Sequence, residues 1–381
     1  MVFNAVLIVQ PEGEIKVKKR LLAAVSAGLC LGGLGTEAMA QSSVTIYGII
    51  DTGVEYLNHT NAAGQGKLRT LPLTGLLPSR IGFKGVEDLG GGLRAFFNLE
   101  SGFVPTTGGM GQGNRLFGRQ SNVGLMDPTW GTFTLGRQYN MTAISLIAAD
   151  IMGPANHGLS NMDSYLPNTR SDNALGYMNK IGNTTVGATY SFGRDTSTAG
   201  GPAATNCAGE NAADAQACRQ WTALIKYDTA TWGVATAYDT LRGGAGAGNL
   251  LTSSNYKDNR ASFNGWFKVG DLKIGGGLIA RHLQRAVDIN YNLWYLGASY
   301  ALTPQWQVEG QVAHLDTRNS PDDSTLGTAR AIYFLSKRTS LYASYAYIKN
   351  RGNAAIAVSS GSTVGVGQNQ SSVMAGIRHT F

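Results

Sequence analysis

The sequence predicts an all-β fold, a sixteen-stranded antiparallel β-barrel that crosses a membrane with its strands. Three observations predict this fold class. Short turns alternate with long loops along the chain, and apolar residues alternate with polar ones in the segments between them. In addition, residues 41–381 contain no uninterrupted apolar run of about 18 residues, which excludes helical membrane spans.

The last eleven residues, 371–381, alternate most clearly. Val373, Ala375, Ile377 and Phe381 fall on one face of the expected strand, and small, polar or charged residues dominate the other. Such a strand invites aggregation when it is left as an exposed edge, but not when it closes a barrel. A terminal strand that ends on phenylalanine resembles the C-terminal signal of bacterial outer-membrane barrels. Phe381 is therefore predicted to be a signal for the barrel-assembly machinery.

The connections predict the number of strands. Short turns are expected at 87–92, 127–131, 181–183, 228–233, 270–271, 302–305 and 336–339, and longer loops at 58–74, 104–114, 139–169, 194–219, 242–258, 284–289, 317–328 and 350–370. Seven turns and eight loops give fifteen connections and hence sixteen strands, with both ends of the barrel on the short-turn side. A barrel of this size encloses an aqueous channel, whereas eight strands would be filled by side chains.

Residues 93–100 illustrate the expected faces. The apolar side chains at the odd positions would meet lipid, and Arg94, Asn98 and Glu100 would face water inside the barrel. Residues 340–348 fit this division less well, because apolar side chains occupy both faces.

The N-terminus reads as a signal peptide over residues 1–40. Basic residues at 16–20 precede an apolar, small-residue stretch at 21–34, and Ala38-Met39-Ala40 matches a small-x-small cleavage site. The mature domain would then be a barrel over 41–381. Because Glu12 and Glu14 precede the basic run, we expect translation to start at Val17.

Two cysteines remain in residues 41–381. Cys207 and Cys218 bracket a small, polar segment, and in an exported protein such a pair is expected to form a disulfide that closes a surface loop. On the chain-entropy model a loop this short gains about 2–3 kcal/mol from the cross-link. Neither His nor a third Cys lies nearby, so the pair does not predict a metal site, and no cofactor is expected.

Several motifs together resemble the general porins of Gram-negative bacteria, especially the β-proteobacterial type. They lie at 43–51, 79–93, 117–120, 134–138, 170–174 and 377–381. The resemblance spans 41–381 and implies a homotrimer in the outer membrane, in contact with lipid and lipopolysaccharide. It also implies one pore per subunit, through which small hydrophilic solutes diffuse, and a third extracellular loop that folds inward to narrow it.

Charged residues predict where the pore is narrowest. Arginines of the alternating segments should face the lumen, because a charge on the lipid face costs about 2–4 kcal/mol near the midplane. The candidates for this cationic wall are Arg80, Arg94, Arg119, Arg137 and Arg170, with Arg137 equally able to anchor a loop. Asp150, and next Asp163, are the candidate acids of the loop, expected to face the arginines. The excess of cations, with a net charge of +6 for 41–381 (27 Lys and Arg, 21 Asp and Glu), predicts mild anion selectivity.

Catalysis is not expected. His59, His157, His282, His314 and His379 stand in no recognisable nucleophile or metal motif, and the scattered basic residues do not suggest binding of nucleic acid. Two other functions stay open: a solute-specific anion channel, and a surface adhesin or receptor that uses the polar loops.

Overall fold

The structure is a computed structural model that describes residues 43–71, 74–197 and 205–381. The predicted signal peptide and the expected start at Val17 lie outside these residues. The elements are β1 (Ser43–Leu57), β2 (Lys67–Thr70), β3 (Arg80–Gly90), β4 (Leu93–Gly102), β5 (Gln120–Asp127), β6 (Gly131–Tyr139), α1 (Met141–Leu146), η1 (Leu159–Asn161), η2 (Leu166–Asn168), β7 (Arg170–Ser171), β8 (Ala174–Ile181), β9 (Thr184–Ser191), β10 (Gln220–Asp228), β11 (Trp232–Arg242), β12 (Lys257–Val269), β13 (Leu272–Gln284), β14 (Ile289–Ala301), β15 (Trp306–Thr317), β16 (Ser324–Phe334), β17 (Thr339–Asn350) and β18 (Gln370–Thr380).

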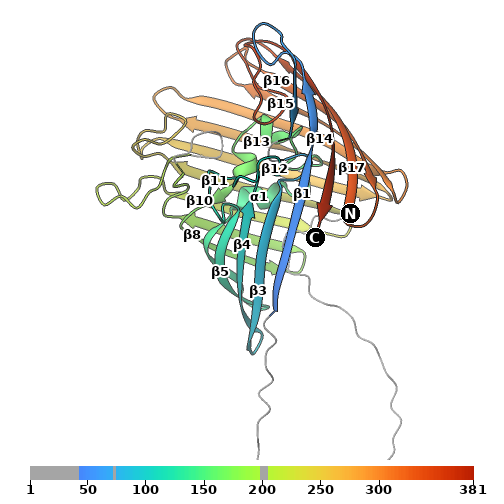
Figure 1. The fold of residues 1–381 in the computed structure, drawn as a ribbon. Coiled ribbons are helices and arrows are strands. Elements are labelled where there is room, and N and C mark those ends of the chain that lie inside the picture. The colour runs from blue at the N-terminus through green and yellow to red at the C-terminus, as the bar shows by residue number, and fades with distance from the viewer. Residues whose placement is uncertain (1–42, 72–73, 198–204) are drawn as a thin grey trace, which may run out of the picture. The chain divides into compact units, whose positions relative to one another are not determined.

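The strands form one antiparallel sheet that closes on itself (Figure 1). Of the strands in the sheet, β2 and β7 are short pieces of four and two residues, and the other sixteen make the barrel. The barrel closes where β1 pairs with β18 over Ile49–Leu57, while the first half of β1 pairs with β3. Sixteen strands, seven short turns and eight long loops are all confirmed.

Both ends of the sheet meet at Gly48 and Phe381. The backbone N–H of Gly48 donates to the carbonyl of Phe381 at 3.0 Å, and the N–H of Phe381 donates back at 3.1 Å. A Cβ at Gly48 would lie 2.3 Å from the ring of Phe381, so only glycine lets the aromatic ring rest here. The last residue of the sequence therefore extends the seam of the barrel.

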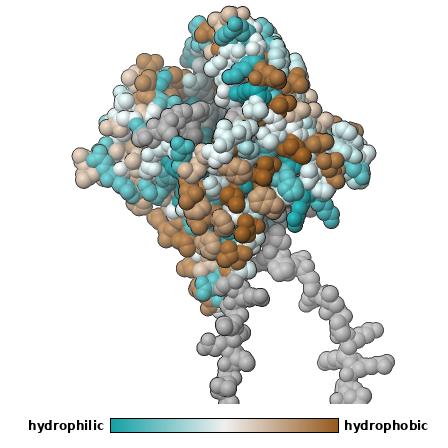
Figure 2. Space-filling view, viewed as in Figure 1, coloured by the Kyte–Doolittle hydropathy of each residue, from teal (hydrophilic) through white to brown (hydrophobic). Residues whose placement is uncertain are grey.

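The two faces of the strands are divided as the alternation predicts. In β18, Val373 and Ile377 are 54% and 45% exposed on the outside, whereas Ser372 and Met374 are 1% exposed on the inside. Figure 2 shows apolar side chains gathered over the outer surface of β3, β4 and β5. In the described part of the chain no helix is both long and apolar enough to cross a membrane.

Part of the first long loop folds into the barrel. Asp51 of β1 accepts hydrogen bonds from the backbone N–H groups of Leu76 and Leu77, both at 2.8 Å, and from the hydroxyl of Tyr342 at 2.7 Å. Leu71, Leu76 and Leu77 pack with inward-facing apolar residues of β1, β16, β17 and β18. The expected loop at 58–74 thus continues to residue 79 and covers one side of the inner wall.

The predicted disulfide is present. Cys207 and Cys218 are bonded, with their Cα atoms 5.2 Å apart, in the loop between β9 and β10. Both cysteines are buried in an apolar cluster with Leu241, Leu251 and Leu283. The cross-link therefore lies inside a packed rim that is formed by the long loops.

Candidate pore constriction

The connection from β6 to β7, residues 140–169, lies inside the barrel, and we call it loop 3. Asn140 is the N-cap of its helix α1: the side-chain oxygen accepts from the N–H of Ala143, a capping bond that fixes the entry to the helix. The N–H of Met141 donates to the hydroxyl of Thr222 in β10, and Ser145 contacts Ser262 in β12. These polar contacts hold α1 on the inner wall.

Glycines in the wall let the next part of loop 3 approach closely. A Cβ at Gly275 of β13 would lie 2.2 Å from the carbonyl oxygen of Ala149, and one at Gly297 of β14 would lie 3.0 Å from the Cβ of Ile151. Any larger side chain at Gly275 would meet backbone rather than a movable side-chain end. Gly275 of β13 and Gly297 of β14 therefore form the part of the wall against which this segment of loop 3 packs.

Asp150 is bound to the wall rather than presented to the opposite side. Gln311 of β15 donates to its carboxylate at 3.0 Å, and the same Gln311 accepts from the N–H groups of Ile151 and Met152. Burial raises the pKa of Asp150 to about 7, against the opposing effect of these hydrogen bonds and of the Arg330 charge. The carboxyl group is thus half titrated near neutral pH.

The tip of loop 3 is held by a buried histidine. His157, 1% exposed, places Nε2 3.0 Å from Glu55 of β1 and 2.9 Å from Ser372 of β18, and Nδ1 3.0 Å from Ser344 of β17. The N–H of the neighbouring Asn156 donates to the carbonyl of Gly75, in the inward part of the first loop. This serine, histidine and glutamate grouping was invisible in the sequence, and its burial suits it to anchor the loop.

The returning part of loop 3 is held by ion pairs. Asp163 accepts two bonds from Arg260 of β12, at 2.8 and 3.2 Å, and lies 3.9 Å from Arg281. Burial alone would raise the pKa of Asp163, but the charges of Arg260 and Arg281 outweigh it and lower the pKa. Tyr165 then inserts its hydroxyl among Asp239, Gln220 and Asn140.

The wall from β3 to β7 carries the arginine cluster, which we define as Arg80, Arg119 and Arg170. Arg119 donates to Glu100 of β4 at 2.6 Å, and Arg80 lies 3.7 Å from the other oxygen of the same carboxylate. The hydroxyl of Tyr47 also donates to Glu100, at 3.0 Å. Glu100, which the sequence indicated only as lumen-facing, is therefore the acid of this cluster.

Tyr139 joins the third arginine to the other two. Its hydroxyl accepts from Arg119 and from Arg170, each at 2.7 Å, and the guanidinium of Arg170 lies 4.4 Å above its ring. This geometry combines charge-assisted hydrogen bonds with a cation–π contact. Three guanidinium groups and one carboxylate thus meet on one wall, an excess of two positive charges.

The remaining candidate arginines lie elsewhere. Arg137 pairs with Asp172 and donates to the carbonyl of Gly118 at 2.7 Å, which fits its alternative role as a loop anchor. Arg94 stands opposite Asp88 beside the short turn between β3 and β4, apart from the cluster.

The arrangement differs from the expected one in the orientation of the loop acids. Asp150 and Asp163 were expected to face the arginines across the pore, but their carboxylates contact Gln311 and Arg260 on the wall behind loop 3. Neither forms an ion pair with the arginine cluster among the described residues. A carboxylate beside the barrel wall gains hydrogen bonds that a position facing the open lumen would not offer.

A closed sixteen-stranded barrel with an apolar exterior and a charged interior, narrowed by an inward loop, is an outer-membrane diffusion channel. The chain belongs to the Gram-negative porin family, which residues 24–353 match. An outer membrane porin protein of Bordetella pertussis is 31% identical over 410 residues, covering 96% of this chain and 100% of that protein.

Two further relatives agree. Outer membrane porin protein 32 of Delftia acidovorans is 30% identical over 360 residues, covering 90% of this chain and 95% of that protein. Among solved structures, an anion-selective porin from Comamonas acidovorans aligns with a TM-score of 0.74 and 26% identity, covering 90% of this chain and all of that one. The protein is thus a passive channel for small hydrophilic solutes in the outer membrane of a Gram-negative bacterium.

Proposed function

We propose that this channel is mildly anion-selective and that the arginine cluster sets its selectivity. The observation that carries the proposal is the charge balance of that cluster, with three guanidinium groups against the single carboxylate of Glu100. The acids of loop 3 do not offset it, because Asp163 is paired with Arg260 and Asp150 lies behind the loop against Gln311. A similar porin carries the description anion-selective, which favours the same conclusion.

The expected strength of selectivity is modest. One unit charge about 10 Å from an ion in water contributes only about 0.4 kcal/mol, or about twofold in the partition of that ion. Because a cation is disfavoured as much as an anion is favoured, each arginine changes the anion-to-cation permeability ratio about two- to fourfold. At 1 M salt the Debye length falls to about 3 Å, and the preference should weaken.

The same family likeness supports a proposal about the assembly. We propose that the protein forms a homotrimer with one pore per subunit, contacts lipid and lipopolysaccharide, and enters the membrane through the barrel-assembly machinery, with Phe381 as part of the signal. We also propose that the chain up to residue 40 is removed as a signal peptide, which comprises residues 17–40 when translation begins at Val17. Phe381 is 42% exposed on the seam, which suits recognition from outside the barrel.

The experiment is a measurement of reversal potential in a planar bilayer under a salt gradient. The wild-type protein should prefer anions, and the double variant Arg80→Gln/Arg170→Gln should lose most of that preference while keeping stepwise openings. Arg285→Gln, which removes a partly exposed arginine from the loop between β13 and β14, is the matched control and should change nothing. A clear cation preference of the wild type contradicts the proposal, and conductance that saturates with one anion favours the solute-specific alternative.

A further inference from the structure

We propose that Arg194, whose backbone is held by the Cys207–Cys218 disulfide, is a positioning residue that fixes Arg170 in the pore constriction. Arg194 lies in the loop between β9 and β10, immediately before Asp195, and is 1% exposed. The inference rests on the proposed role of Arg170 in selectivity and adds that an extracellular disulfide controls how firmly Arg170 is held.

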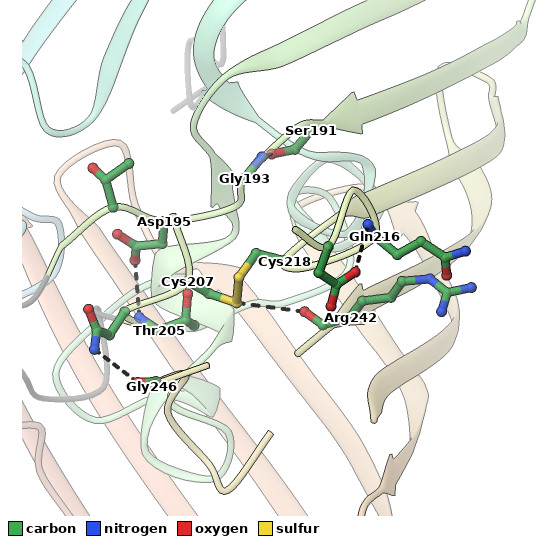
Figure 3. The surroundings of a disulfide bond; sticks show 12 residues. Ser191, Gly193, Asp195, Thr205, Cys207, Gln216, Cys218, Arg242 and Gly246 are labelled. Carbon is green, nitrogen blue, oxygen red and sulfur yellow. Dashed lines mark hydrogen bonds between the residues drawn. A yellow bond between two sulfur atoms is a disulfide. The ribbon is translucent and has the colours of Figure 1, made fainter. Parts of the chain in front are cut away.

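The disulfide holds Arg194 and Asp195 by their backbone. The N–H of Arg194 donates to the carbonyl of Cys218 at 3.2 Å. Asp195 and Cys207 exchange two backbone hydrogen bonds, of 3.3 and 2.8 Å. Each cysteine therefore binds one of these two neighbouring residues, and Figure 3 shows Asp195 beside the disulfide.

The disulfide is itself fixed from the other side. The N–H of Cys218 donates to the carbonyl of Gly243 at 2.9 Å, and the sulfur of Cys207 lies 3.8 Å from the carbonyl oxygen of Arg242 (Figure 3). A Cβ at Gly244 would lie 2.8 Å from the sulfur of Cys218, so the next loop packs directly on the bond. The cross-link is a rigid point between two loops.

Arg194 in turn makes hydrogen bonds to residues on both sides of Arg170. Its guanidinium donates to the carbonyl of Asn168 at 2.7 Å and lies 5.0 Å above the ring of Tyr165. Its backbone carbonyl accepts from the N–H of Asp172 at 2.9 Å. One residue thus fixes the chain two positions before and two positions after Arg170.

The neighbouring Asp195 supports the same segment. Its carboxylate pairs with Arg115, and Arg115 also lies 3.3 Å from the carboxylate of Asp172. Since Asp172 pairs with Arg137 as well, the backbone that carries Arg170 is held from two directions. Loss of the disulfide should loosen Arg194 and Asp195 together. Arg170 would then be held less firmly, and the anion selectivity should fall.

The test uses the purified full-length channel in planar bilayers. Dithiothreitol on the extracellular side gives two electrons and two protons to the disulfide, leaving two thiols on the protein and the cyclic disulfide of the reagent. The wild type should then show higher open-channel noise and a reversal potential closer to zero. Cys207→Ser/Cys218→Ser should show both changes from the start and no response to the reagent.

Arg194→Gln should reproduce the same phenotype with the disulfide intact, and Arg285→Gln should not. If the double-serine variant does not fold, reduction of the folded wild type still decides the matter. Unchanged noise and reversal potential after complete reduction overturn the proposal, as does an Arg194→Gln channel identical to the wild type. One mixed outcome separates the two proposals: the reduced channel becomes noisy, but Arg170→Gln has unaltered selectivity. That outcome rejects the role of Arg170 in selectivity and supports the role of the disulfide and Arg194 in holding the chain around Arg170.

Discussion

Gln311 holds Asp150 and the turn that follows it with one side-chain amide. The amide nitrogen donates to the carboxylate of Asp150 at 3.0 Å, and the amide oxygen accepts from Ile151 and Met152 at 3.1 and 3.2 Å. Gln311 thus contacts both the buried carboxyl group of Asp150 and the backbone that follows it. Protonation of Asp150 is therefore coupled to the position of loop 3. This coupling gives the first prediction.

Loop 3 should be held more firmly at acid than at alkaline pH. The pKa of Asp150 rises from 3.8 to about 7, so the folded protein prefers the protonated form. The resulting destabilisation is absent below the ordinary pKa, grows between about pH 4 and 7 and is complete above pH 7. The midpoint of heat-modifiable unfolding on gels should therefore fall across this window in the wild type and fall less in Asp150→Asn. An equal fall in both proteins contradicts the assignment to Asp150.

Glu100→Gln should increase anion selectivity and lower stability. The substitution raises the excess charge of the arginine cluster from two to three, which favours anions about two- to fourfold more. It also leaves Arg119, 3% exposed, without its carboxylate partner, and breaking a buried pair costs about 3–5 kcal/mol. Reversal potential and unfolding temperature measure the two effects. A channel that becomes less anion-selective argues against the cluster as the filter.

Gly275→Val should displace loop 3. The new Cβ would lie 2.2 Å from the carbonyl oxygen of Ala149, and overpacking of this kind costs about 1–3 kcal/mol. The expected result is altered single-channel conductance with a lower unfolding temperature. Gly327→Val is the matched control in β16, where a Cβ meets nothing within 4 Å. Equal effects of both substitutions point to general strand destabilisation rather than to loop 3.

His157→Ala should loosen the tip of loop 3. It leaves Glu55, Ser344 and Ser372 with one buried hydrogen-bond partner fewer, and an unsatisfied buried polar group costs about 1–3 kcal/mol. Open-channel noise should rise and the unfolding temperature should fall. His59→Ala, at an exposed loop position, should match the wild type in both measurements.

The strands and their connections were predictable because turn residues and the period-2 alternation are local signals. Residues 340–348 were ambiguous for a physical reason that only the structure reveals. The inward-facing Tyr342, Ala346 and Ile348 are apolar because the first loop and loop 3 cover them. Where a loop covers the inner wall, the inward-facing side chains are buried and apolar like those of a protein core. The alternation of apolar and polar residues along the strand is therefore lost.

The constriction was predictable only in part. Arg80, Arg119 and Arg170 do come together, but the partner acid Glu100 and the bridging Tyr139 carry no distinguishing local signal. The inward segment of the first loop did leave a trace, since residues 71–77, at the end of the expected polar loop 58–74 and just after it, contain four leucines. The orientation of an acidic side chain in loop 3 depends on contacts with residues that are distant in sequence, as in the contact of Asp150 with Gln311.

The pairing of β1 with β18 also dictates the order in which this protein can fold. Every hairpin of the barrel joins strands that are neighbours along the chain, but the contact of Ile49 with Thr380 joins residues about 330 positions apart. Closure therefore comes last and depends on the complete chain, as expected for a fold with such distant contacts. Until that moment both edges remain open, so the nascent protein needs protection against pairing with its neighbours.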